Sequence, residues 1–186
     1  MVFRRLRSAE IKRSLFENFE RHQIVTDCYR RENGQWVIKP APFTDQWSEK
    51  DYRFLVKCLK TTIRNGGVVY GAFMRGSLKG FASVENEPFG SRGQYLDLTS
   101  LHVSEDMRGL GIGRSLFSLA CGFAAAHGVE KLYISSHSAV ETQRFYEAVG
   151  CVDAEETMEE HVRREPYDRQ LEKKLDTERS NGGTDG

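Results

Sequence analysis

The stretch from Leu101 to Phe117 constrains the fold more than any other part of the 186-residue chain. Apolar residues at Leu101 and Val103 mark the end of a strand, and the glycine-rich turn Arg108–Gly113 follows before an amphipathic helical pattern. A glycine-rich turn that opens a helix leaves several backbone N–H groups unpaired, and the helix dipole adds partial positive charge there. The sequence therefore predicts a strand, a turn and a helix that together bind an anion, with phosphate or pyrophosphate as the best fit.

The spacing of the glycines argues against two common nucleotide sites. A Walker loop requires Lys and then Ser or Thr after its last glycine, but Arg114 follows Gly113. A dinucleotide-binding fingerprint requires glycine at the position that Arg114 occupies. The turn therefore predicts neither a nucleoside triphosphate site nor a dinucleotide site, and Arg108 and Arg114 are placed to pair with further phosphate oxygens.

The strand before the turn carries a break in its alternation. Leu96 and Leu98 share one face of a pleated strand, whereas Leu101 and Val103 have the opposite parity. One extra residue near Thr99 restores a single apolar face, which is the pattern of a β-bulge. Such a bulge frees main-chain N–H and C=O groups, so an extended ligand can add along the strand there.

Hydrophobic periodicity, capping residues and turn residues place further elements around this unit. Before the turn, we expect a helix over Ser8–Arg21 and a hairpin of Ile24–Arg30 and Gln35–Lys39 around Asn33 and Gly34. A second helix should run from Ser48 to its end at Gly66. Three strands should follow, over Val68–Phe73, Leu78–Glu85 and Gln94–Val103. After the turn, we expect a helix up to Gly128 and a strand over Lys131–Ser136. A further helix should begin with a capping box at Ser138–Glu141 and end at Gly150, before one or two more strands. Pro40 and Pro42 are expected to end the second hairpin strand. Segments 24–30 and 167–175 fit either a helix or a strand.

The charge balance and the cysteine spacing exclude several classes of protein. Lys and Arg together number 27, as do Asp and Glu, so no net positive charge favours nucleic acid or an anionic membrane. No apolar run is long enough to span a bilayer, and the basic N-terminus lacks the apolar stretch of a signal peptide. The four cysteines are widely spaced, which is typical of reduced thiols in a cytoplasmic protein and gives no metal-ligand pattern. We expect one domain over residues 1–176, a disordered polar tail over 177–186 and no bound metal.

The turn Arg108–Gly113, directly after a strand that ends in Leu-x-Val, resembles the acetyl-CoA-binding motif of the GNAT acetyltransferase superfamily. The order of strands and helices over about Val68–Cys151 is also similar to that of the family. The resemblance implies an α/β sandwich, with a mixed, mostly antiparallel central sheet, a β-bulge in the fourth strand and helices on both faces. It also implies an acetyl-CoA-dependent N-acetyltransferase that moves an acetyl group to a primary amine by direct attack in a ternary complex.

The implied cosubstrate is acetyl-CoA, and the implied acceptor is a small-molecule or peptide amine. Neither nucleic acid nor a membrane is expected as a partner, and an exposed edge strand in such a sheet would allow a homodimer. The alternative is a non-catalytic module that binds and senses an acyl-CoA. One measurement separates the two, because only an enzyme releases thiol from acetyl-CoA when an amine is present.

The resemblance carries the family's cofactor contacts onto the end of the strand and onto the turn, where main-chain amides hold the ligand. The matching positions are Leu101, His102, Val103, Arg108, Gly109, Leu110, Gly111, Ile112, Gly113 and Arg114. Many members also have Asn seven residues before the tyrosine of a second motif. This chain has Ala139 there, and Ser138 is the neighbouring polar residue expected to replace it.

The run Phe145–Cys151 resembles that second motif, an aromatic residue followed by Tyr-Glu-x-x-Gly and a hydrophobic residue. The resemblance gives Tyr146 the role of the general acid that protonates the departing thiolate. An alkylammonium must lose a proton before it attacks, and the family often places an acidic residue for this at the position of Asp97. His102, on the same strand face as Asp97, and Glu85, on the neighbouring strand, are the alternative bases.

Overall fold

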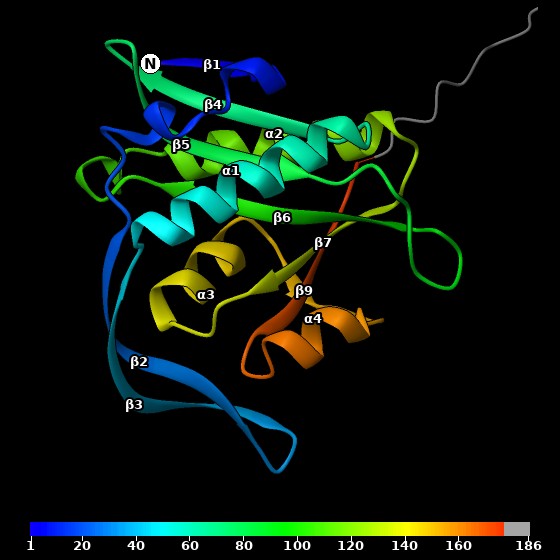
Figure 1. The fold of residues 1–186 in the computed structure, drawn as a ribbon. Helices are drawn as coiled ribbons and strands as arrows, with labels where there is room; N and C mark the ends of the chain where they lie inside the picture. Colours follow the sequence, from blue (N-terminus) through cyan, green and yellow to red (C-terminus); the bar gives the residue numbers. More distant parts are fainter. Residues whose placement is uncertain (177–186) are drawn as a thin grey trace, which may run out of the picture.

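A seven-stranded sheet forms the centre of the computed structural model, which describes residues 1–176 (Figure 1). Its strands lie in the order β1 (Val2–Arg5), β4 (Val68–Met74), β5 (Ser77–Val84), β6 (Tyr95–Val103), β7 (Lys131–Ser136), β9 (Arg169–Lys174) and β8 (Val152–Asp153). A separate hairpin is formed by β2 (His22–Glu32) and β3 (Gln35–Gln46). The pair β6–β7 is parallel and the other described pairs are antiparallel.

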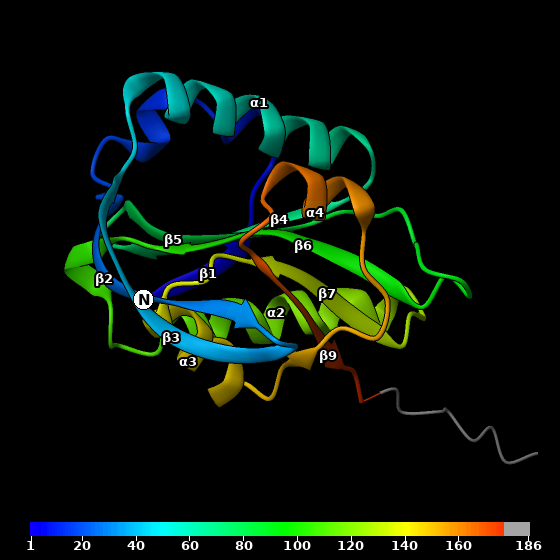
Figure 2. The ribbon, with the colours of Figure 1, turned by 90° about the horizontal axis from the view of Figure 1, so that it is seen from below.

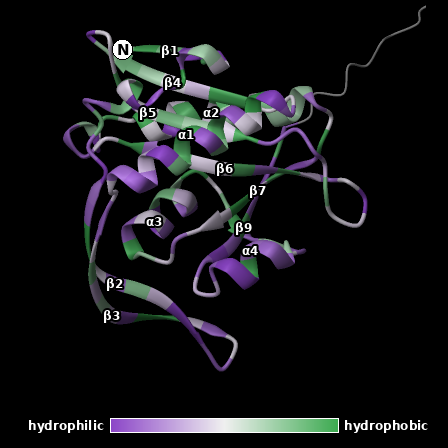
Figure 3. Cartoon of the chain, in the orientation of Figure 1, coloured by the Kyte–Doolittle hydropathy of each residue, from purple (hydrophilic) through white to green (hydrophobic). Residues whose placement is uncertain are grey.

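Helices cover both faces of the sheet. They are α1 (Glu49–Arg64), α2 (Ile112–Ala126), α3 (Val140–Ala148) and α4 (Glu159–Arg164). Figure 2 shows α1 and α4 on one face and α2 and α3 on the other. Hydrophobic residues follow the central strands, whereas α4 and the tip of the hairpin are largely hydrophilic (Figure 3). The predicted α/β sandwich with a mixed, mostly antiparallel sheet is confirmed.

Helix α1 begins with the capping box that the sequence predicts. The Ser48 hydroxyl accepts a hydrogen bond from the Asp51 N–H, and the Asp51 carboxylate accepts one from the Ser48 N–H at 2.7 Å. Leu55 and Leu59 lie on the buried stripe of the helix, where they pack onto the sheet. The helix ends just before Gly66, whose φ of +88° suits glycine.

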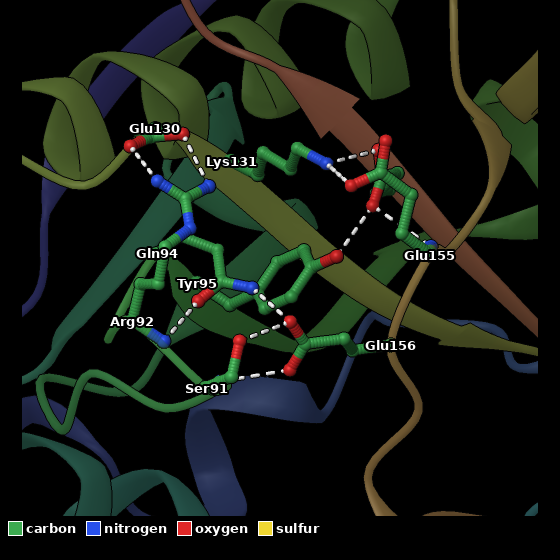
Figure 4. A network of polar contacts seen from close by, with 9 residues as sticks. Ser91, Arg92, Gln94, Tyr95, Glu130, Lys131, Glu155 and Glu156 are labelled. Carbon is green, nitrogen blue, oxygen red and sulfur yellow. Dashed lines mark hydrogen bonds and ion pairs between the residues drawn. The ribbon is translucent and has the colours of Figure 1, made fainter.

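Strands β6 and β7 pair over three residues and then separate. The paired residues of β6 are Tyr95, Leu96 and Asp97. A polar network holds the strands together at this paired end (Figure 4). In it, the Tyr95 hydroxyl donates to Glu172 at 2.5 Å, and Lys131 Nζ lies 2.7 Å from the same carboxylate. The ends of β6 and β7 that lead to the turn and to α3 are therefore left apart.

The predicted β-bulge is confirmed in β6, the fourth strand in sheet order. The register of β5 and β6 shifts by one residue between Ser83 and Val84, which leaves Thr99 as the extra residue. The Thr99 hydroxyl oxygen lies 2.8 Å from that of Ser83. Because the bulge reverses the parity of the strand, Leu101 and Val103 pack against the same hydrophobic cluster as the leucines before it.

The prediction of a helix over Ser8–Arg21 is wrong. This segment forms two short 3-10 helices, Ser8–Glu10 and Arg13–Phe16. Ile11 and Phe19 are nevertheless buried between α1 and the sheet. The helical spacing of the apolar residues therefore reflects burial of the segment and not its backbone conformation.

The predicted hairpin around Asn33 and Gly34 is confirmed, and both residues have positive φ, at 49° and 81°. The expectation that Pro40 and Pro42 end its second strand is wrong, because β3 continues to Gln46. Among the described residues β3 pairs only with β2, so a proline without an N–H is tolerated on its free side.

The two segments that fit either a helix or a strand are strands, β2 and β9. Strand β1 and helix α4 are elements that the sequence patterns did not indicate. The capping box expected at Ser138–Glu141 is absent, because α3 begins after Ala139 without a side-chain cap. The tail expected over 177–186 lies outside the described residues. Over residues 1–176, no helix has the length and apolar character needed to cross a membrane.

Candidate functional site

Beyond Asp97, the edge of β6 that faces β7 has no strand partner among the described residues. On the other edge, the Ser104 N–H donates to the Lys79 carbonyl at 2.9 Å, in register with the β5–β6 ladder. Ladder bonds alternate along an antiparallel pair, so the N–H and C=O groups of Leu101 and Val103 point away from β5. Both residues therefore direct free main-chain groups into the gap between β6 and β7.

The glycine-rich turn presents a second set of free amides. Gly109 and Gly111 both have φ of +77°, and a Cβ at either position would meet no atom within 4 Å. Gly111 is the N-cap of α2 and supplies no side-chain cap. Within residues 1–176, no backbone bond uses the N–H groups from Gly109 to Arg114. The turn is therefore an uncapped helix N-terminus that faces open space, as an anion site requires.

The two arginines of the turn lie on its two sides and are exposed. Arg108 Nη2 donates to the main-chain carbonyl of His22 at 2.6 Å, and Arg114 Nη1 donates to that of Ala148 at 3.4 Å. Leu110 is 65% exposed, whereas Ile112 is buried. The side chain of Ile112 thus anchors the turn to the core while the turn itself stays accessible.

Helix α3 lies against the start of α2 and brings Tyr146 to this end of the molecule. A Cβ at Gly113 would lie 3.2 Å from the Phe145 ring and 3.6 Å from the Val103 side chain. Tyr146 is buried beside Phe117, at 6.1 Å between ring centroids. Burial raises the pKa of Tyr146 above its ordinary value, so the phenol keeps its proton at every physiological pH.

Asp97 is the last residue of β6 that pairs with β7, and its side chain is buried at that point. Its Oδ2 lies 2.7 Å from Nε2 of His161, which α4 supplies. Its Oδ1 is buried without a hydrogen-bond partner among the described residues. A buried carboxylate oxygen without a donor is costly, so Oδ1 requires a hydrogen-bond donor that the described residues do not supply.

The alternative bases, His102 and Glu85, lie in different surroundings. His102 lies between Trp47 and Phe81, with ring centroids 4.8 and 5.2 Å away. Burial, together with Arg21 and Arg108, lowers the pKa of His102 to about 3, which makes it a weak base. The Glu85 carboxylate accepts a hydrogen bond from the Thr62 hydroxyl of α1.

Ser138 is buried where the β2–β3 hairpin meets the start of α3. Its hydroxyl accepts a hydrogen bond from Arg30 at 2.7 Å, and its carbonyl accepts one from the Tyr29 N–H at 2.8 Å. Cys28 and Ala139 form an isolated bridge at the same place. The hydroxyl that we expected to face the cofactor is thus bound to the hairpin.

No group of three or more His, Cys, Asp or Glu residues that could hold a metal ion occurs in the described chain. The cysteines of the described chain are free thiols. Burial raises the pKa of Cys121 to about 11 and that of Cys151 to about 12, so both are protonated and unreactive near neutral pH.

The turn, the bulged strand and α3 meet at Gly113, which lies against the Val103 side chain and the Phe145 ring, and Tyr146 follows Phe145 on α3. The sequence did not indicate His161, because α4 has six residues and no apolar stripe that would mark it as a helix. It also missed the contact of the hairpin with α3. The presence of Asn33 and Gly34 indicated the hairpin itself but not where it packs.

Comparisons with known proteins agree on one family. A profile described as the acetyltransferase (GNAT) family matches residues 22–151. Nourseothricin acetyltransferase has a similar structure, with a TM-score of 0.66 and 16% identity over 94% of this chain and 96% of that one. A putative streptothricin acetyltransferase from Bacillus anthracis, solved with acetyl coenzyme A, has a TM-score of 0.63. Its sequence is 16% identical, over 92% of this chain and 95% of that one.

A PaiA N-acetyltransferase from Thermoplasma acidophilum, solved with coenzyme A, has a TM-score of 0.58 and 13% identity over 94% of this chain and 98% of its own. At these identities the likeness shows a shared fold. No match to the sequence is found among curated proteins.

Proposed function

This chain belongs to the GNAT acetyltransferase family, and on that premise we propose that it transfers the acetyl group of acetyl-CoA to a primary amine, by direct attack in a ternary complex. The family carries out acyl-CoA-dependent acetyl transfer in general. We assign the activity to a single domain over residues 1–176. The acceptor is a small-molecule or peptide amine.

One observation carries the proposal: free main-chain donors line both the open edge of β6 and the uncapped start of α2. The turn amides at Gly109–Arg114 suit a pyrophosphate, with Arg108 and Arg114 at either side. The free groups of Leu101 and Val103 suit the amides of an extended pantetheine chain. Ile112 anchors the turn through its buried side chain, and His102 supports β6 by packing between Trp47 and Phe81. Leu110 contributes its free main-chain N–H. The Ser138 hydroxyl accepts from Arg30 and keeps its own O–H to donate to the cofactor.

Bound acetyl-CoA would supply an activated thioester. The main-chain N–H groups that point into the gap stabilise the negative charge that develops on the carbonyl oxygen, an effect worth ~3 kcal/mol per donor. Asp97 accepts the proton that the amine must lose, and Tyr146 holds a proton for the departing sulfur. All these groups belong to β6, the turn and α3.

Two measurements test the proposal. Calorimetry with acetyl-CoA should show binding to the full chain, and a thiol-release screen over amines should identify an acceptor. Binding without thiol release from any amine would favour the alternative, a non-catalytic acyl-CoA-binding module. No binding of acetyl-CoA at all would refute both.

A further inference from the structure

Helix α4 places an imidazole against the carboxylate assigned as the base. His161 Nε2 lies 2.7 Å from Asp97 Oδ2, and the two side chains are 13% and 8% exposed. The Tyr133 ring of β7 is stacked on the imidazole, with 6.1 Å between ring centroids and 26° between planes. The pair is therefore held from three elements, at the point where β6 and β7 separate.

The contacts define where the imidazole proton lies. Arg164 Nη2 lies 3.3 Å from His161 Nδ1, and a guanidinium can only donate. Nδ1 is therefore the acceptor, which places the proton on Nε2, where the Asp97 carboxylate accepts it. This neutral tautomer satisfies Asp97 Oδ2 and leaves Asp97 Oδ1 as the buried oxygen without a partner.

We propose that His161 is a positioning residue for proton removal: its Nε2–H fixes the Asp97 carboxylate so that Oδ1 accepts a proton from the amine substrate. This inference rests on the proposed function. The acceptor's ammonium N–H bond breaks and an O–H bond forms on Oδ1, while the electron pair stays on nitrogen and forms the bond to the acetyl carbon. The carbon–sulfur bond breaks, and sulfur leaves with its electron pair and takes a proton from Tyr146. The new amide nitrogen loses its second proton to solvent, Asp97 Oδ1 then releases the proton it took up, and solvent reprotonates the phenolate.

The charge of His161 should control this step. The hydrogen bond that His161 donates to Asp97 raises the pKa of His161, against the effects of burial and of Arg164, and Glu160 also raises it. Asp168 and the Tyr133 ring are the other ionisable groups that face the imidazole. Once protonated, His161 holds Asp97 in an ion pair, and its positive charge competes with the substrate ammonium for the carboxylate. Acetyl transfer should therefore fall as pH drops through the raised pKa of His161.

Two variants separate this role from a purely structural one. In His161→Ala, Asp97 loses its donor, so kcat should fall about 10- to 100-fold near pH 8 while the KM for acetyl-CoA stays within about threefold. In His161→Gln, a neutral N–H donor remains but cannot titrate. This variant should recover part of the lost kcat and move the acidic limb of its pH profile to lower pH. His127→Gln, on the exposed C-terminal end of α2, is the matched control and should behave as the wild type.

A measurement independent of turnover tests the pairing itself. NMR titration should show a raised pKa for His161 and the Nε2–H tautomer, and Asp97→Asn should bring that pKa back toward its ordinary value. A His161 pKa that Asp97→Asn leaves unchanged would overturn the pairing, whether or not the protein turns over. Unchanged kcat in His161→Ala, or an unmoved acidic limb in His161→Gln, would overturn the positioning role. A wild type that acetylates no amine would refute the proposed function and this role together, while the NMR result would still report on the pair.

Discussion

At the scale of single residues, Gly111 offers the sharpest test of the anion site. Asn and Asp both tolerate its φ of +77°, and their Cβ would meet no atom within 4 Å. Gly111→Asp should therefore fold like Gly111→Asn but place a negative charge at the start of α2. Calorimetry should show acetyl-CoA binding at least about 10-fold weaker for the Asp variant than for the Asn variant. Equal affinities for the two variants would contradict a pyrophosphate at the turn. Gly113→Asp is less informative, since its Cβ would lie 3.2 Å from Phe145.

The hydroxyl of Tyr146 should matter for turnover and not for binding. Tyr146→Phe keeps the ring in the core, and no hydrogen bond of this hydroxyl within residues 1–176 is lost. We expect kcat to fall about 10- to 100-fold, with the calorimetric affinity for acetyl-CoA unchanged. Tyr70→Phe on β4 is the control, because both tyrosines are 7% exposed and the Tyr70 hydroxyl accepts only a 3.4 Å hydrogen bond from Arg5. A similar loss of kcat in both variants would point to packing and not to proton donation.

Asp168 should make the stability of the protein depend on pH. Burial, reinforced by Glu165, raises the pKa of Asp168 to about 6, so the folded state binds its proton more tightly than the unfolded state. The contribution of Asp168 to stability is therefore greatest below its unfolded pKa of about 4 and is lost as pH rises through about 6.

Replacing Asp168 with a neutral residue should abolish this loss of stability at neutral pH. Asp168→Asn should be more stable than the wild type at pH 7.5 by about 1 kcal/mol, a value reduced for partial solvent exposure, or roughly 2–4 °C in Tm. The difference should vanish near pH 4. Thermal denaturation from pH 4 to 7.5 measures the difference in Tm between the two proteins. A difference that stays constant with pH would exclude titration of Asp168 as its cause.

At the scale of elements, side-chain alternation predicted β6 well because the bulge leaves a trace in the sequence. The parity of Leu101 and Val103 is that trace, and the register shift at Thr99 is its cause. Helix α4 leaves no such trace, since five of its six residues are charged or His. The expected helix at the N-terminus failed for the opposite reason, because buried irregular backbone mimicked a helical period.

Hydrogen exchange should distinguish the elements that bind acetyl-CoA. The amides of Leu101 and Val103 and those from Gly109 to Arg114 should become protected when acetyl-CoA is added, because the ligand accepts their N–H groups. The hairpin tip at Asn33 and Gly34 should exchange as before. Protection that is equal at the tip and at the turn would indicate a general stabilisation in place of a local contact.

At the scale of the whole molecule, the sequence indicated that the turn, the bulged strand and α3 are neighbours. It did not indicate which residues from distant segments pack against them. The turn, the bulged strand and Tyr146 come from a continuous strand–helix–strand–helix run, whose order restricts the fold. Contacts such as Arg30 to Ser138 and His161 to Asp97 join positions more than 60 residues apart. No local pattern reports such pairs, because each depends on how separate layers pack.

The short parallel pairing of β6 with β7 also has a mechanical consequence. Three residue pairs join a half-sheet of β1, β4, β5 and β6 to a half-sheet of β7, β9 and β8. Past these three pairs, no main-chain pairing joins β6 to β7 among the described residues. A molecule bound along the free edge of β6 would add contacts between the two half-sheets beyond these three pairs. Occupancy of the gap would then stiffen the place where the two halves are least tied to each other.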